Sequence, residues 1–272
     1  MTTETVQAVR FNILGVAVSA LGRHQVVNEV IDAARRRKRL GVSALAVHGI
    51  MLATGNPAIR ARLNRLDIVT PDGQPVRWAL NILHRAGLAE RVYGPDLMRD
   101  VSARARDEGL PIFLYGSTTA TLEALERSLK QCYSGVIIAG AQPSRFRPIS
   151  EHERAEQIRR IRDSGAAIVF VGLGCPRQEI WVYENMHELS IPVLAVGAAF
   201  DYLAGKKAEP PNWMMRAGLQ WTHRLIKEPR RLWKRYLLLN PLYLILVCLQ
   251  GMRLRRFPMD SNMDVITAVR PG

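Results

Sequence analysis

The chain has 272 residues, 48% of them hydrophobic, which is enough to bury a sizeable core and excludes an intrinsically disordered chain. Its net charge of +14 is uneven, because residues 206–256 carry 12 basic and two acidic side chains, a net +10. The three cysteines lie far apart with no C-x-x-C pair, which argues against a disulfide framework or a zinc site and fits a reducing cytosol.

Short apolar runs rich in β-branched residues alternate with longer helical patterns through most of the chain. We predict strands at residues 11–14, 44–47, 67–70, 112–115, 136–139, 168–171 and 193–196, and helices at 25–37, 57–66, 75–85, 95–108, 118–131, 151–164 and 178–189. This order is typical of an α/β fold with a Rossmann-like parallel sheet flanked by helices. Because the alternation stops after Val196, we place a boundary near Gly205. It separates a catalytic core (1–205) from a helical, basic, membrane-associating appendage (206–272).

Within the appendage, Pro229 is expected to begin a helix. The apolar run at 236–252 is shorter than the ~20 residues of a spanning helix, and we expect Asn240-Pro241 to interrupt it. Cations beside Trp233 and a leucine run favour a membrane surface over nucleic acid, since phosphate binding alone does not require leucines. We therefore expect a cytoplasmic protein attached peripherally to the inner face of the cell membrane, with no nucleic-acid partner.

Ligands of an open parallel sheet bind beyond the C-terminal ends of its strands. This rule selects the turns at 48–49, 71–73, 116–118 and 172–179, followed by 197–201 after the last strand. Asp72, beside a glycine, suits a general base that faces a substrate hydroxyl. Capping of the helix that begins near Pro75 is the simpler explanation and, from this stretch alone, the favoured one.

The turn at 172–179, GLGCPRQE, offers backbone N–H groups at a helix N-terminus together with Arg177 and Gln178, which suits an anion or a sugar hydroxyl. A tight strand-to-helix turn explains it equally well. A dinucleotide fingerprint would need a glycine where Arg177 stands. Cys175 has no nearby base and is expected to be a packing thiol. Arg91 is either a solvated charge or a side chain directed into the cleft.

Several of these stretches together resemble one family, the WecG/TagA/CpsF glycosyltransferases of bacterial surface and extracellular polysaccharide synthesis. The resemblance covers residues 11–246 and is carried by PDGQPVRWA, RVYGPDLM, VGLGCPRQEIW, GAAFDYLAG and PNWMMRAGLQWTHRLIKEPRRLWKRY. The last stretch is long and unusual, so it makes the resemblance specific.

The resemblance implies an inverting, metal-independent transfer of a sugar from a UDP-sugar to a polyprenyl-diphosphate-linked saccharide, without a cofactor. By position, Asp72 matches the family's base and Gln178 its sugar-contacting glutamine. The substrate-binding set that we expect is His48, Arg91, Gly172, Gly174, Gln178 and Glu179, and the diphosphate-binding set is Arg224, Arg231 and Arg235.

The chemistry of the leaving group points the same way. A departing UDP places negative charge on a diphosphate, which needs a metal ion or fixed cations. The chain has no D-x-D pair, the acidic pairing expected of a metal-using sugar-nucleotide enzyme, so arginine is the remaining option.

The chain departs from the family pattern at four places. Ala46 and His48 stand where Thr and Asn are common, Pro75 replaces a glycine, and Glu209-Pro210-Pro211 replaces R-A-P. N-acetylmannosamine, glucose and related hexoses therefore all remain candidates for the transferred sugar. Whether the protein forms a homo-oligomer also stays open.

Two alternative functions remain. The strand before the 172–174 glycines motivates a nicotinamide-dependent oxidoreductase, and the basic segment motivates a non-enzymatic membrane- or nucleic-acid-binding protein.

Overall fold

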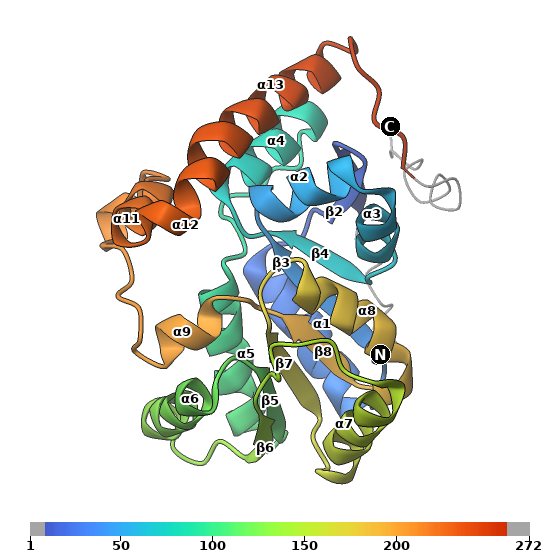
Figure 1. Cartoon of the computed structure of the whole chain (residues 1–272), viewed down its shortest axis with the longest axis vertical. Helices are drawn as coiled ribbons and strands as arrows, with labels where there is room; N and C mark the ends of the chain where they lie inside the picture. Colours follow the sequence, from blue (N-terminus) through green and yellow to red (C-terminus); the bar gives the residue numbers. More distant parts are fainter. Residues whose placement is uncertain (1–8, 260–272) are drawn as a thin grey trace.

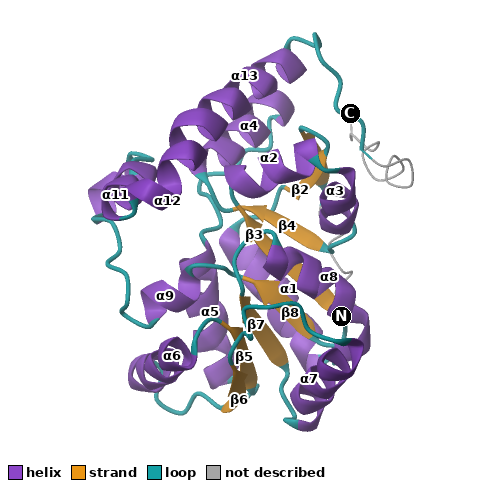
Figure 2. Ribbon diagram, viewed as in Figure 1, coloured by secondary structure: helices purple, strands orange, loops and turns teal. Residues whose placement is uncertain are grey.

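The computed structural model describes residues 9–259 and centres on a six-stranded parallel sheet with helices on both faces (Figures 1 and 2). The strands lie in the order β4-β3-β8-β7-β5-β6. Their bounds are β3 (Leu40–Leu45), β4 (Ile68–Pro71), β5 (Ile112–Gly116), β6 (Ile138–Gln142), β7 (Ile168–Gly172) and β8 (Pro192–Ala195). The predicted α/β class and the parallel sheet are confirmed.

Two hydrophobic cores lie on opposite faces of this sheet. One is formed with α1 (Arg23–Arg35), α5 (Gly94–Asp107), α6 (Thr119–Cys132) and α9 (Ala199–Leu203). The other is formed with α2 (Val47–Gly55), α3 (Pro57–Asn64), α4 (Gln74–His84), α7 (Glu151–Asp163) and α8 (Arg177–Leu189). Strand β7 contributes Val169 and Val171 to the second core and Ile168 and Phe170 to the first. A strand covered on both faces is expected to be apolar at every position, as this run is.

The first predicted strand forms but does not join the parallel sheet. Strand β1 (Arg10–Ile13) pairs antiparallel with β2 (Val16–Ser19), which the sequence analysis did not predict. The two residues between them, Leu14 and Gly15, both have positive φ, 53° and 89°. That is the backbone of a two-residue hairpin turn, so the chain reverses here instead of crossing to a parallel neighbour.

A second difference lies after β3. The predicted strand at 44–47 ends two residues earlier, at Leu45, and α2 begins at Val47. This helix was missed because it is mainly apolar and lacks a clear amphipathic pattern. His48 therefore lies in the first turn of a helix at the C-terminal end of β3.

The C-terminal part consists of α10 (Asn212–Arg216), α11 (Gln220–Lys227), α12 (Pro229–Trp233), a π-helical segment η1 (Lys234–Leu239) and α13 (Asn240–Gly251). A helix begins at Pro229 as predicted. The expected interruption at Asn240-Pro241 is wrong, because the chain stays helical from Pro229 to Gly251. Proline lacks the N–H that an α-helix needs at that position, and the wider π turns before it accommodate the loss.

Helix α13 lies beside α4 and α2 at the upper end of the molecule in Figure 1. Its Tyr243 is fully buried, in the same core as α2 and α4. The helix Pro229–Gly251 has the length and apolar composition of a membrane span, by those two criteria alone. The expectation that this segment is too short therefore does not hold for the whole helix. The domain boundary near Gly205 stays a prediction. Residues 1–8 of the predicted core and 260–272 of the predicted appendage lie outside the described residues.

Candidate active site

A cleft of about 710 Å³ lies at the C-terminal ends of the sheet strands and is closed on one side by the appendage. Nine of the predicted site residues line it, namely Asp72, His48, Gly172, Gly174, Gln178, Glu179, Arg224, Arg231 and Arg235. The tenth, Arg91, lines a smaller adjoining hollow together with Asp72, His48, Arg224 and Arg235. The structure thus brings together residues from four turns of the core and three helical segments of the appendage.

Asp72 follows β4 and precedes α4 in the chain. Its carboxylate, however, is bound by the first residue of another helix, α5. Gly73, not Asp72, is the N-cap residue of α4, so the capping explanation is wrong. Instead, the Gly94 N–H at the start of α5 donates to Asp72 Oδ1 at 2.8 Å. A side chain at Gly94 would meet the Val196 carbonyl at 2.9 Å, so only glycine lets this N–H come so close.

Burial sets the chemistry of this carboxyl group. Desolvation raises the pKa of Asp72 above its ordinary value, while Arg91, the Gly94 N–H, Arg224 and Arg235 each lower it. A carboxylate with a raised pKa is a stronger base than an exposed one, and general bases work best with a pKa nearer the working pH. The surrounding cations favour the ionised form and so oppose this shift.

Arg91 is directed into the site instead of being a solvated charge. Its Nη1 donates to the main-chain oxygen of Asp72 at 3.3 Å, and its guanidinium lies 4.4 Å from the centre of the Tyr93 ring. Stacking on an aromatic face fixes the plane of the guanidinium, so the charge beside Asp72 has a defined position.

The appendage supplies two half-buried arginines and one exposed arginine. Arg224 (α11) and Arg235 (η1) are half-buried and act electrostatically on Asp72. Arg231 (α12) is different, because its side chain is 58% exposed and pairs with Glu228. Of the three arginines predicted to bind the diphosphate, Arg224 and Arg235 are therefore better placed to do so. Arg231 would first have to release Glu228.

An ion-pair chain joins the appendage to the core. Lys207 Nζ lies 2.9 Å from Asp201 of α9 and 2.9 Å from Glu228, which also binds Arg231. Sequence reasoning noted Asp201 only as part of a turn and missed Lys207, since no local pattern shows that a lysine bridges residues so far apart.

His48 lies beside Arg235 and is neutral at neutral pH. Burial, with a smaller contribution from Arg235, lowers its pKa to about 4. Its Nδ1 is buried and has no hydrogen-bond partner. A neutral imidazole next to the predicted base suits a hydrogen bond to a substrate hydroxyl better than contact with an anion.

The turn at 172–179 is held by its own side chains. Gln178 is 3% exposed, accepts from the Gly174 N–H at 3.1 Å and donates to Glu179 Oε1 at 2.8 Å. Glu179 is also buried, which raises its pKa, and it accepts from Ser43 Oγ at 3.3 Å. In the structure, Gln178 thus fixes the turn at Gly174, and its direct contact with a sugar stays a prediction.

Burial raises the pKa of the Cys175 thiol well above its usual value, which disfavours a thiolate nucleophile.

Within residues 9–259, no group of three or more His, Cys, Asp or Glu side chains is arranged to hold a metal ion.

The cleft at the C-terminal edge of the parallel sheet, with a carboxylate among arginines, has the features of an enzyme active site. Comparison with family models agrees: residues 11–257 match the glycosyl transferase WecG/TagA/CpsF family. Because this match covers nearly the whole chain, the chain belongs to that family. The oxidoreductase and the non-enzymatic alternatives are accordingly set aside.

The electrostatics of Asp72 can be measured directly. We expect its carboxyl pKa, followed by NMR of the 13C-labelled carboxyl group, to exceed the ordinary value of about 3.9. Arg91→Gln removes a cation that favours the ionised form, so the pKa should rise further in that variant. Arg177→Gln changes an exposed arginine that is not among the residues lining the cleft, so it is the control and should leave the pKa of Asp72 unchanged. A wild-type value at or below the ordinary one would contradict the described environment.

Proposed function

We propose that the protein transfers a hexose from a UDP-sugar to a saccharide carried on a polyprenyl diphosphate, at the inner face of the cell membrane. The observation that carries the proposal is the convergence of Asp72 with Arg91, Arg224 and Arg235 around one cleft. One base and several fixed cations are the groups that this reaction requires of a protein.

In the proposed reaction, the acceptor hydroxyl oxygen attacks the anomeric carbon of the donor sugar. The bond between that carbon and the diphosphate oxygen breaks, and UDP leaves with the electron pair. The hydroxyl proton passes to Asp72. A single displacement of this kind inverts the anomeric configuration, and no covalent sugar–enzyme intermediate forms.

The arginines are proposed to stabilise the departing diphosphate. Guanidinium groups keep their charge and bind phosphate oxygens through two parallel N–H donors. Arg224 and Arg235 are half-buried, so water screens their charges less than it screens that of Arg231. Metal independence rests on this role of the arginines and remains part of the proposal.

The identity of the sugar depends on residues near Asp72. Ala46 and His48, which depart from the family pattern, line the cleft beside Asp72. Glu209, another departure, is ion-paired with Arg99. Donor selection is thus assigned to the Ala46–His48 end of α2, and N-acetylmannosamine, glucose and related hexoses remain candidates.

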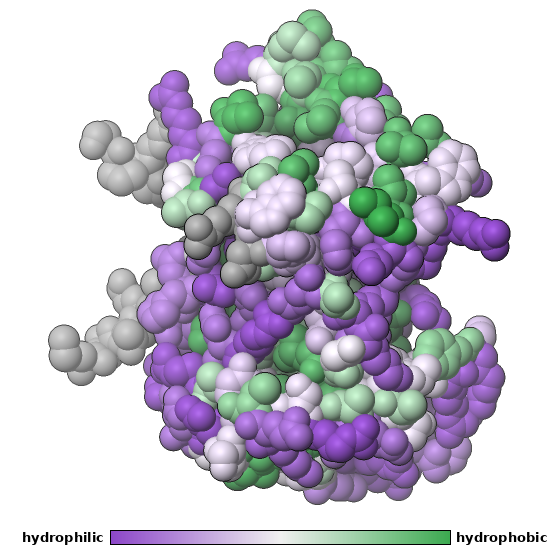
Figure 3. All heavy atoms as spheres, turned by 90° about the vertical axis from the view of Figure 1, so that its left-hand side faces the viewer, coloured by the Kyte–Doolittle hydropathy of each residue, from purple (hydrophilic) through white to green (hydrophobic). Residues whose placement is uncertain are grey.

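Membrane attachment is proposed to use the exposed apolar side chains of the C-terminal helix. Those more than 40% exposed are Trp233, Leu237, Leu238, Leu242, Leu244 and Ile245. Figure 3 shows apolar residues gathered at the upper end of the molecule, while the lower part of this face is mainly hydrophilic. Basic residues beside this surface suit anionic lipid headgroups. Homo-oligomerisation stays a prediction.

The test of the proposed base is Asp72→Asn, assayed with a panel of UDP-sugars and a lipid-diphosphate acceptor. We expect the transfer rate to fall about 100- to 10,000-fold, because a general base contributes that much, while UDP still binds. Asp163→Asn, which changes an exposed carboxylate of α7 that is not among the residues lining the cleft, is the control and should retain most activity. Full turnover by Asp72→Asn would contradict the assignment.

The membrane proposal is tested by cosedimentation with vesicles that contain anionic phospholipid. Leu237→Asp with Leu238→Asp should lower the bound fraction strongly, because two exposed leucines of the apolar surface become charged. Ile137→Asp, which changes another exposed apolar residue, just before β6, serves as the control. Equal binding by both variants would refute this surface.

A further inference from the structure

Three buried polar groups beside Asp72 have no partner in the described part of the chain. Gln74 Oε1, Gln220 Nε2 and His48 Nδ1 are buried, and none of the groups in residues 9–259 forms a hydrogen bond with them. All three residues line the smaller hollow that adjoins the cleft. Buried polar atoms normally have a partner, and each unpaired one lowers the stability of the fold. Unpaired groups gathered around one hollow therefore indicate a place where a ligand supplies the partners.

The hollow lies where the appendage packs against the core. Gln74 is the first residue of α4 in the core, and Gln220 is the first residue of α11 in the appendage. Gly218, just before α11, has a φ of +73°, and a Cβ atom there would lie 3.4 Å from Trp78 and 3.6 Å from Gln74. The backbone of the appendage therefore packs directly against the first turns of α4. Each part of the chain supplies one wall, so the hollow is complete only when the two parts are together.

The size and chemistry of the hollow suit part of one sugar. Its volume of about 70 Å³ is several times the ~10–15 Å³ that a single water molecule needs. The rings of Trp221 and Tyr236, with centroids 6.0 Å apart, also line it. A glutamine amide both donates and accepts hydrogen bonds, as a sugar hydroxyl does, whereas an ionised diphosphate only accepts. Aromatic walls with a few polar groups are typical of sites that orient a small organic ligand.

Asp72 borders both the cleft and the hollow. The Gly172–Gly174 turn lines only the cleft, whereas Gln74 and Gln220 line only the hollow. In the proposed displacement, the base must reach the attacking hydroxyl while the donor sugar lies close to that hydroxyl. A donor in the cleft and an acceptor in the hollow meet this requirement, because Asp72 borders both spaces.

The hollow is also close to the proposed membrane surface. Tyr236 and Asn240 of the C-terminal helix line it. Leu237 and Leu238, which lie between them in the chain, are 54% and 55% exposed and belong to the apolar surface. An acceptor carried on a membrane lipid must reach the site from that surface, whereas a water-soluble sugar nucleotide has no such need. The position of the hollow thus favours the acceptor over the donor as its occupant.

We propose that the hollow is the acceptor subsite, in which the Gln74 and Gln220 amides hydrogen-bond the acceptor sugar and place its attacking hydroxyl beside Asp72. This inference rests on the proposed function, because it takes a lipid-linked saccharide as the acceptor. Polar groups that are held in place before the ligand arrives lose little freedom on binding. Their hydrogen bonds to the sugar also explain why the fold keeps these amide atoms buried without partners among residues 9–259.

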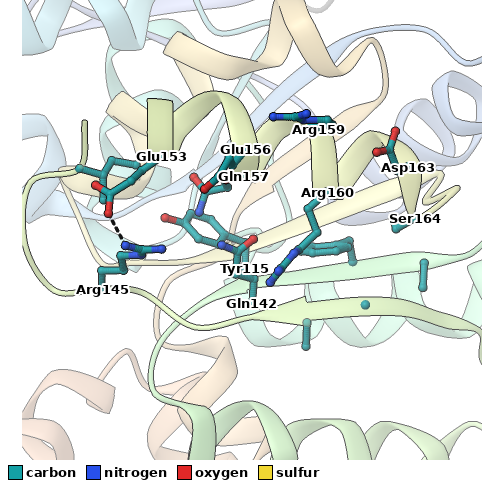
Figure 4. Close-up of a pocket in the computed structure, with 15 residues that line it drawn as sticks. Tyr115, Gln142, Arg145, Glu153, Glu156, Gln157, Arg159, Arg160, Asp163 and Ser164 are labelled. Carbon is teal, nitrogen blue, oxygen red and sulfur yellow. Dashed lines mark hydrogen bonds and ion pairs between the residues drawn. The ribbon is translucent and has the colours of Figure 1, made fainter. Parts of the chain in front are cut away.

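A larger groove elsewhere provides a matched control. It has a volume of about 690 Å³, lies between β6 and α7, and in the described part of the chain shares no lining residue with the cleft or the hollow. Figure 4 shows Arg145 and Glu153 directed toward one another in this groove, and the two are ion-paired. Gln142, labelled in the same view, has a buried Oε1 with no hydrogen-bond partner among residues 9–259. It therefore matches Gln74 in chemistry but lies outside the proposed subsite.

The test is the steady-state kinetics of the full-length protein with a UDP-sugar and a lipid-diphosphate-linked saccharide. Gln74→Leu with Gln220→Leu should lower kcat/KM for the acceptor about 5- to 100-fold, which corresponds to the loss of two ordinary hydrogen bonds. The affinity for UDP, measured by isothermal titration, should stay at the wild-type value. The melting temperature should stay the same or rise, because apolar side chains of similar size replace buried polar atoms that lack partners. Gln142→Leu should match the wild type in both kcat/KM and UDP affinity.

The outcomes separate this inference from the proposed function. If the wild type transfers sugar and the doubly substituted protein keeps the wild-type kcat/KM for the acceptor, the subsite is wrong and the proposed function stands. An equal loss of UDP affinity also overturns the subsite, since the amides then act on the donor. A fall in melting temperature that accompanies the loss of activity assigns the two glutamines a structural role and overturns it too. If the wild type neither binds UDP nor transfers sugar, the proposed function and the subsite both fail.

Discussion

The central constraint in this structure is the charge of Asp72, a half-buried carboxylate that acts as a base only in its ionised form. Removing Asp72 from water favours its neutral form, and only nearby cations and a hydrogen bond oppose this. The opposing groups come from three separate parts of the chain: Arg91 and Gly94 before and at the start of α5, Arg224 in α11 and Arg235 in η1. A site built this way is complete only when the appendage lies on the core.

Several features of the fold serve that placement. Tyr243 anchors the C-terminal helix in the core beside α4, the helix that follows Asp72. Lys207 joins Asp201 to Glu228, which fixes the start of the same long helix. The π-helical segment between these two anchors carries Arg235. Segments of this kind are frequent at functional sites, because they change the direction of side chains within a continuous helix.

Much of the fold follows from local sequence patterns. The runs that form β5 and β7 are apolar at every position and are bounded by glycines, so their strands were predicted to within a residue. The hairpin strand β2 and helix α2 were missed for physical reasons. The strand depends on positive φ at Leu14 and Gly15, which has no clear sequence signal at Leu14. The helix is mainly apolar, so it shows no clear helical period.

The candidate site was only partly predictable. Position after strands identified Asp72 and the 172–179 turn, and the resemblance added Arg91 and the appendage arginines. Local reasoning favoured Asp72 as a helix cap, because nothing in its own stretch reveals the Gly94 N–H that it binds. Lys207 carries no local signal at all. Its role depends on long-range ion pairing, which only the folded chain shows.

The claim that fixed arginines stabilise the leaving diphosphate is tested most directly by the initial rate of UDP release in excess EDTA. UDP is quantified by chromatography, so that the readout itself needs no metal. The account predicts that the wild type keeps its rate in EDTA and that Arg224→Gln with Arg235→Gln lowers it about 100-fold or more. Loss of wild-type turnover in EDTA, with the doubly substituted protein fully active in its absence, would contradict it.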